Sequence, residues 1–320
     1  MDDEKKLYPF KFIPIDENPA ENVLLADLGY QDSMIRDGWL SANCISEVMD
    51  TYMDRVTGER SFEFYGRQFP VMLKVINGLE RTPLMVCPDD ETAAQRLDFL
   101  GKAKFWHINS AKPGSRIYLG FKKDVQAEEF YMACRHNTVE DLLNIVEPKE
   151  GDCFFVKPGL VHAAGEGVVI TEIAESSPLD FRIHNWGKPI PGDEFDAELN
   201  LEAAFDFIDY KACPAASCSG KDCPAGCDEF NVRLVKPKDS EHISSSEADS
   251  FVLYYCIKGE ASLQIPSEVG PVNYTVKAGE CLLVPAEVPD FFLIPVLKGT
   301  KLLETVIGNH HNTTEPWQTE

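Results

Sequence analysis

The sequence has few basic residues for its length, and this shortage limits the partners it can have. Lys and Arg together number 30, against 53 Asp and Glu, and the formal net charge is -23. Nucleic acid is bound by clustered positive charge, and an acidic membrane surface repels a negative protein. We therefore expect neither nucleic acid nor a membrane among the partners. A small anionic ligand stays open, because a pocket can be positive on a negative protein.

Long apolar runs are also lacking. No stretch approaches the roughly 18 apolar residues that a membrane-spanning helix needs. The charged residues 1–6 are not followed by the apolar run of a secretory signal. Ten cysteines without such a signal favour reduced thiols over a framework of disulfides. These features predict a cytoplasmic protein, and its 320 residues are enough for two domains.

A histidine that follows a short apolar segment is the first candidate functional residue. Residues 153–156 are apolar and lie between two turn-forming sequences, so they predict a short buried strand. His162 follows the second turn, and we expect its ring to point into a barrel. The spacing of Gly151, Gly159 and His162 resembles the second cupin motif, with the proline of that motif displaced by one residue. A strand-turn-strand with an incidental histidine is the alternative.

The second half of the chain repeats this pattern. Gly279 and Pro285 have the motif's glycine-five-proline spacing, and Asp290 stands where the histidine would be. Short segments of β pattern recur at intervals of about 8–12 residues, which is typical of barrels and sandwiches. We predict a mostly β protein with two cupin (jelly-roll β-barrel) domains and a few inserted helices. The expected parts are a first domain at 1–190, a helix and Cys-rich linker at 191–230, and a second domain at 231–320.

The helices expected within this pattern follow from apolar residues at helical spacing. They are predicted at 41–56, 124–134, 138–145 and 194–210.

Several segments in combination resemble one enzyme family. The sequence Met85-Val86-Cys87-Pro88-Asp89-Asp90 stands where that family has Gln-Val-His-Pro-Asp-Asp. Residues 101–106, Gly-Lys-Ala-Lys-Phe-Trp, stand where it has Gly-Lys-Thr-Glu-Cys-Trp. The His162 motif and residues 167–186 then follow in register. Together these segments resemble the class I mannose-6-phosphate isomerase family, in its short bacterial form with two cupin domains.

The resemblance implies a divalent metal, usually zinc, held by two histidines and a glutamate, with a glutamine in some members. Matched by position, the glutamine becomes Met85, the first histidine Cys87 and the glutamate Lys104, and only His162 is kept. A charged lysine has no acceptor with which to bind a metal. We infer that the Lys104 ammonium occupies the place of the metal, so that none is bound in the first barrel. If the family site survives, zinc would be held by His162 and Cys87.

The resemblance also supplies Glu172 and Arg182 as candidate residues, and His184 is added because it has the same parity as Arg182 on one predicted strand. Lys104, His162, Glu172, Arg182 and His184 are expected to bind the substrate, with Lys104, Glu172 and Arg182 the catalytic candidates. The alternatives are that Lys104 turns out to solvent, that Cys87 is a small buried hydrophobic residue, and that Glu172 and Arg182 form a structural ion pair.

Four cysteines in the linker form a separate candidate site. Cys213, Cys218, Cys223 and Cys227 lie within 15 residues, and such a group is able to hold a structural zinc ion. Unligated thiols are the first alternative, because the usual two-residue spacing is absent, and a disulfide is the second, which a reducing compartment disfavours.

The function expected from these observations is binding of a sugar or sugar phosphate, with little or no metal-dependent isomerase activity. Two alternatives stay open. One is an active aldose-ketose isomerase that converts mannose 6-phosphate to fructose 6-phosphate with a residual metal or with Lys/Glu acid-base chemistry. The other is a non-catalytic structural or regulatory partner protein.

Overall fold

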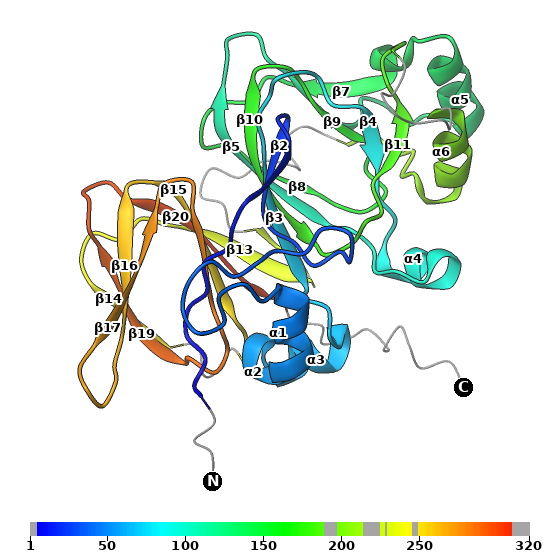
Figure 1. The fold of residues 1–320 in the computed structure, drawn as a ribbon. Coiled ribbons are helices and arrows are strands. Elements are labelled where there is room, and N and C mark those ends of the chain that lie inside the picture. Colours follow the sequence, from blue (N-terminus) through cyan, green and yellow to red (C-terminus); the bar gives the residue numbers. More distant parts are fainter. Residues whose placement is uncertain (1–4, 189–196, 214–224, 228, 245–248, 309–320) are drawn as a thin grey trace. The chain divides into compact units, whose positions relative to one another are not determined.

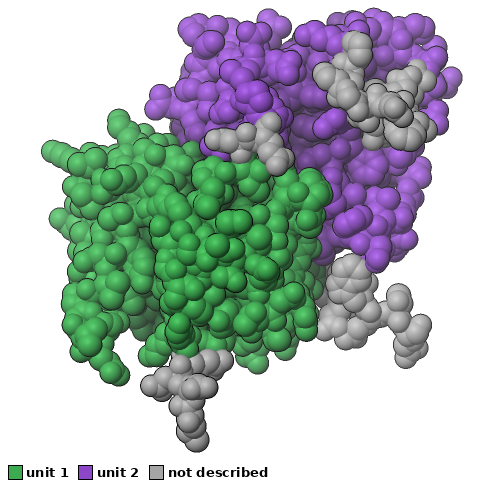
Figure 2. Space-filling model, viewed as in Figure 1, with its two compact units in different colours: residues 1–15, 23–72, 222–313 green, residues 16–22, 73–221, 314–320 purple. Residues whose placement is uncertain are grey.

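The computed structural model describes residues 5–188, 197–213, 225–227, 229–244 and 249–308, and these residues are mostly in antiparallel β-sheets (Figure 1). They divide into two compact units (Figure 2). Unit 1 contains residues 1–15, 23–72 and 222–313, and unit 2 contains residues 16–22, 73–221 and 314–320. No helix within the described ranges is long and apolar enough to cross a bilayer.

Unit 2 carries most of two sheets. The six-stranded sheet has the order β1-β2-β3-β10-β5-β8, and the five-stranded sheet has the order β11-β4-β9-β6-β7. The bounds of the first six strands are Ile15–Asn18, Glu21–Leu25, Val71–Ile76, Val168–Glu175, Lys104–Ala111 and Cys153–Val156. Those of the other five are Phe181–His184, Leu84–Val86, His162–Ala164, Ile117–Phe121 and Leu143–Val146.

Unit 1 repeats this arrangement with the second half of the chain. Its sheets have the orders β12-β13-β20-β15-β18 and β14-β19-β16-β17. The order β3-β10-β5-β8 thus recurs as β13-β20-β15-β18, and β4-β9-β6-β7 recurs as β14-β19-β16-β17. The duplication expected from the two glycine-proline motifs therefore extends to the strand order. The bounds are Ala225–Gly226, Phe230–Val235, Lys301–Ile307, Val252–Lys258, Cys281–Val284, Glu241–Ser244, Asp290–Pro295, Glu260–Ile265 and Val272–Lys277.

The N-terminal segment lies with unit 1, which differs from the expected first domain at 1–190. The backbone N–H of Phe10 donates to the carbonyl of Leu283 at 2.7 Å, and that of Ala286 donates to Val56 at 3.0 Å. These hydrogen bonds join residues near the start of the chain to strands formed by its second half. Much of the expected linker at 191–230 lies outside the described residues, and its boundaries stay a prediction.

The helices agree with expectation only in part. They are α1 (Ile45–Tyr52), α2 (Asp54–Thr57), α3 (Glu59–Tyr65), α4 (Asp90–Leu97), α5 (Ala127–Arg135) and α6 (Ala197–Ala204), with 3-10 turns η1 (Val139–Leu142) and η2 (Phe205–Phe207). The helix expected at 138–145 is wrong beyond residue 142. Residues 143–146 pair with β6 as strand β7.

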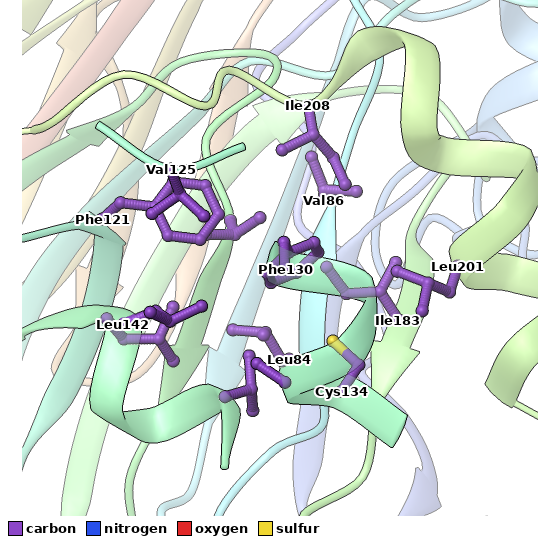
Figure 3. Packing of buried hydrophobic residues seen from close by; sticks show 14 of the residues in the cluster. Leu84, Val86, Phe121, Val125, Phe130, Cys134, Leu142, Ile183, Leu201 and Ile208 are labelled. Atoms are coloured by element: carbon purple, nitrogen blue, oxygen red, sulfur yellow. The ribbon is translucent and has the colours of Figure 1, made fainter. Parts of the chain in front are cut away.

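An apolar cluster covers one face of the five-stranded sheet, so a functional site can form only on the other face. Leu84, Val86 and Ile183 pack with α5 and α6 on its outer face, as Figure 3 shows for ten labelled residues of the cluster. Because successive strand residues point to opposite faces, Met85 on β4 points the other way. The same alternation on β9 buries Ala163 in the outer cluster and turns His162 towards the six-stranded sheet.

Candidate functional site

Lys104 and His162 meet between the two sheets of unit 2. Lys104 lies on β5, its side chain is fully buried, and its Nζ is 3.0 Å from Nε2 of His162 on β9. The alternative that Lys104 turns out to solvent is therefore wrong. His162, which is 1% exposed, points inward as the cupin-like motif predicted.

The hydrogen bonds of His162 define its tautomer. Its Nδ1 lies 2.8 Å from the carbonyl oxygen of Leu160, which can only accept, so Nδ1 carries the proton. Nε2 then offers its lone pair to the Lys104 ammonium. Burial, together with the charge of Lys104, lowers the pKa of His162 to about 3. The ring is thus neutral, and the nitrogen that would bind a metal is occupied by the amine.

Asp180 joins the cluster from the segment between β10 and β11. Its carboxylate pairs with Lys104 and accepts from Lys102 Nζ at 2.6 Å and from Cys87 Sγ at 3.3 Å. Burial opposes the charge of Asp180, but Lys102 and Lys104 lower its pKa well below the ordinary value. Burial likewise opposes the charge of Lys104, and Asp180 is the largest influence that raises its pKa. Both groups are therefore ionised.

Glu172 on β10 connects the cluster to β3. Trp106 Nε1 donates to its Oε2 at 2.6 Å, Lys74 Nζ lies 3.4 Å from Oε1, and Lys104 Nζ lies 3.9 Å from Oε2. Burial would raise the pKa of Glu172, but Lys104 and Lys74 lower it to about 2. Lys74 also pairs with Glu21 at 3.1 Å, so three ammoniums face three carboxylates.

A possible metal-binding group exists in this cluster. One ligand atom each from Cys87, His162 and Asp180 lies within 4.8 Å of the others. Burial raises the pKa of Cys87 to about 12, so its sulfur is a thiol, whereas metals bind the thiolate. The Lys104 ammonium lies against His162 and Asp180, two of these three donors.

Arg182 and His184 differ in their relation to this centre, although the sequence put both on one strand face. Arg182 is paired with Met85, and Met85 is paired with His162, so all three point to the same face. Arg182 is exposed, and its Cα is roughly 10 Å from that of His162 across two strand spacings. It therefore stands at the rim.

His184 is not brought into the cluster, because the strand register shifts between Arg182 and His184. This bulge pairs His184 with Leu84, whose side chain lies in the outer apolar cluster. Its Nδ1 accepts from the backbone N–H of Trp186 at 3.0 Å. Because of the bulge, residues 182 and 184 do not point to the same face. The prediction that His184 lies in the pocket depended on that shared face.

Three polar residues of the cluster were missed by the sequence reasoning. Lys102 is two residues before Lys104 on the segment that leads into β5, which was the available signal, whereas Asp180 lies in a segment without helix or strand. Lys74 is the one charged residue of the otherwise apolar strand β3.

The linker cysteines are described only in part. Cys213 and Cys227 are half-buried, and Cys218 and Cys223 lie outside the described residues, so the structural zinc stays a prediction. Cys153 is disulfide-bonded, which corrects the expectation of reduced thiols at that residue.

Curated relatives of the chain have one name in common. The mannose-6-phosphate isomerase ManA of Bacillus subtilis is 25% identical over 270 residues, which are 82% of either chain. The mannose-6-phosphate isomerase of Streptococcus mutans is 24% identical over 222 residues, 68% of either chain. The chain is thus similar in sequence to mannose-6-phosphate isomerases, as the motifs around Cys87, Lys104 and His162 predicted.

The fold agrees with this similarity. The crystal structure of the Bacillus subtilis mannose 6-phosphate isomerase superposes with a TM-score of 0.75 at 18% identity, covering 93% of this chain and 99% of that one. No protein-family model matches the chain. The family resemblance and the mostly β cupin fold expected from the sequence are thus confirmed.

Proposed function

We propose that unit 2 binds a sugar or sugar phosphate at a site in which the Lys104 ammonium replaces the family's metal ion. The observation that carries this proposal is the placement of Lys104 Nζ between His162 Nε2 and the carboxylate of Asp180. An imidazole lone pair and a carboxylate are what a divalent cation would use, and here both contact an amine. Little or no metal-dependent isomerase activity is expected, because an ammonium lacks the Lewis acidity of a metal.

The donor set supports an amine better than a divalent ion. A zinc ion at this position would need the Cys87 thiol to lose its proton and the Lys104 ammonium to move away. Each change acts against the buried ion pairs that hold the cluster together. We derive no catalytic step through a metal for this reason.

The charges of the cluster favour an anionic ligand. Lys104 would attract a phosphate or a carbonyl oxygen, and Arg182 at the rim would contact the far end of the ligand. Glu172, which the sequence predicts as a substrate-binding residue, already accepts from Trp106 and pairs with Lys74. We now assign it to positioning those two side chains.

An active isomerase is the second candidate, and the close approach of Cys87, His162 and Asp180 favours it. A metal on this group would activate the sugar carbonyl. Acid-base chemistry without a metal has weaker support. A base works best when its pKa is near the operating pH, and the pKa values of His162 and Glu172 are about 3 and about 2.

A structural or regulatory partner protein is the third candidate. It is favoured by the burial of Lys104, His162 and Glu172, each at most 1% exposed. The cytoplasmic location and the absence of nucleic-acid and membrane partners stay predictions from the sequence.

The test combines metal analysis with ligand binding. The protein is purified without chelator, with the four linker cysteines replaced by serine so that only the unit 2 site is measured. We expect less than one tenth of an equivalent of zinc, no turnover of mannose 6-phosphate, and saturable binding of a sugar phosphate by calorimetry. One equivalent of zinc that is lost in His162→Ala, with turnover, would establish the isomerase instead. No binding of any sugar phosphate would favour the partner protein.

Arg182 and His184 provide a matched pair for the binding site. Arg182→Ala should weaken sugar-phosphate binding about tenfold or more, since a charge-assisted hydrogen bond contributes about 1.5–3 kcal/mol. His184→Ala should leave the dissociation constant unchanged. Equal effects of the two variants would remove Arg182 from the proposed site.

A further inference from the structure

Asp180 is the point at which the buried lysine cluster meets solvent. Lys102, Lys104 and His162 are at most 2% exposed, whereas the Asp180 side chain is 24% exposed. Asp180 follows β10 in a segment, 176–180, that has no helix or strand. The Asp180 side chain therefore contacts the buried lysines from the solvent side. No strand hydrogen bonds fix its backbone.

The contacts of Asp180 are those that a bound anion would make. One oxygen accepts from Lys102 Nζ at 2.6 Å, and the other accepts from Lys104 Nζ and from Cys87 Sγ, the latter at 3.3 Å. Carboxylate and phosphate oxygens of a ligand would accept from the same ammoniums in the same way.

The two ammoniums have other partners that would hold them in place without Asp180. Lys102 Nζ donates to the carbonyl oxygen of Ser177 at 2.7 Å, and Lys104 Nζ donates to His162 Nε2 at 3.0 Å. Removal of the Asp180 carboxylate would thus leave a cationic position that is already formed and reached from solvent at the place where Asp180 lay.

We propose that Asp180 is a tethered anion that fills the anion-binding position of the cluster, and that the carboxylate or phosphate of a ligand takes this position when the Asp180 side chain swings out. The inference rests on the proposed function in that this ligand is the sugar phosphate. The side chain competes with the ligand, so the apparent affinity is reduced by the fraction of molecules in which the position is open.

Formate rescue of Asp180→Ala tests the anion position directly, because formate supplies the three heavy atoms that the substitution removes. Thermal unfolding is measured in sodium formate and in sodium chloride of equal ionic strength. At about ten times its dissociation constant, formate should raise the midpoint of the variant by roughly 3–5 °C. The wild-type protein should show no formate-specific shift.

Asp124→Ala is the matched control, since it removes the carboxylate of a surface pair with Lys211. It should behave as the wild type does. If Asp180→Ala is unfolded in chloride, folding on addition of formate supports the proposal, and Asp180→Ser serves as a milder variant for the same titration. A formate response of the Ala and Ser variants no larger than that of wild type would overturn it.

Binding of mannose 6-phosphate to the same variants separates this inference from the proposed function. Tighter binding to Asp180→Ala than to wild type, by tenfold or more, supports both. Formate rescue with no sugar-phosphate binding to either protein supports the tethered anion and removes the proposed ligand. Unchanged sugar-phosphate affinity together with no formate rescue overturns the tethered anion alone.

Discussion

Lys104 is held by a carboxylate and an imidazole, and its side chain is fully buried. Its contacts explain why a lysine is tolerated at a position with 0% exposure. A buried charge that loses its partner is costly, so removal of any one member should lower the stability of the protein.

Removal of the ammonium should therefore show how much it contributes to the free energy of unfolding. Lys104→Met keeps the length of the side chain but leaves His162 Nε2 without this donor and Asp180 with one lysine fewer. We expect a loss of about 3–5 kcal/mol in the free energy of unfolding, measured by urea denaturation at pH 7. Lys157→Met is the control, because Lys157 is half-exposed and its pair with Asp209 lies at the surface. Its loss should stay below about 1 kcal/mol. Equal losses would show that Lys104 is not tied into the cluster.

The pH dependence of stability should report the neutral state of His162. Its pKa in the folded protein, about 3, lies below the ordinary 6.5, so unfolding takes up a proton between these values. This contribution is complete above about pH 6.5 and is lost as the pH falls towards 3. The free energy of unfolding should decrease by up to about 1.4 kcal/mol per pH unit between pH 6 and 5 on account of this group.

His162→Gln, which keeps an acceptor for Lys104, should reduce this slope. A smaller slope should remain in this variant, because burial also lowers the pKa of His184. A slope that is identical in wild type and His162→Gln would contradict the assignment. Below about pH 4.5 the protonation of Glu172 should destabilise both proteins further, because its pKa in the folded state is about 2.

At the scale of strands, the duplication shows what Glu172 does. Glu172 on β10 is paired with Trp106 on β5, and Glu304 on β20 is paired with Tyr254 on β15. In each pair the aromatic side chain donates to the carboxylate, at 2.6 Å in unit 2 and 2.8 Å in unit 1. A basic residue also pairs with each glutamate, Lys74 in one unit and Arg233 in the other.

This group of a glutamate, an aromatic donor and a basic residue occurs in both units, whereas the lysine site occurs in one. Counting two residues back from the aromatic residue leads to Lys104 in unit 2 and to Val252 in unit 1, where the side chain is part of the apolar core. A glutamate bonded to an aromatic donor and a basic residue is thus present with and without the lysine site. Its role is to brace neighbouring strands.

Trp106→Phe and Tyr254→Phe should consequently have similar effects. Each removes the donor to a buried carboxylate oxygen, and each should lower the free energy of unfolding by about 1–3 kcal/mol in urea denaturation. Trp106→Phe should retain sugar-phosphate binding within a factor of about three. A loss of sugar-phosphate binding without a loss of stability would show that Glu172 and Trp106 belong to the ligand site.

The sequence predicted strands more reliably than it predicted the partners of the site. The apolar run at 153–156 became β8, and the position of His162 after a turn correctly predicted an inward ring. Lys104 was identified by its place in a family segment. Asp180 was missed because it lies in an irregular segment, where no period relates a residue to a face. His184 was misassigned because a bulge is not visible in the spacing of two residues.

The molecule as a whole is a duplicated β protein in which one copy keeps a polar centre. His162 in the first motif and Asp290 in the second stand at equivalent places, on β9 and β19. The duplication could be predicted from the glycine-proline spacing, since equal turns fix equal strand ends. The placement of residues 23–72 with the second copy could not, because it depends on hydrogen bonds between residues more than 200 positions apart.

Anomalous X-ray diffraction at the zinc absorption edge, on crystals of wild-type protein grown with zinc, tests the central claim most directly. The account predicts that no anomalous peak lies among Cys87, His162 and Asp180, and that the Lys104 amine is seen within hydrogen-bonding distance of His162 Nε2. A strong peak coordinated by those three residues, with the lysine turned away from it, would contradict the account.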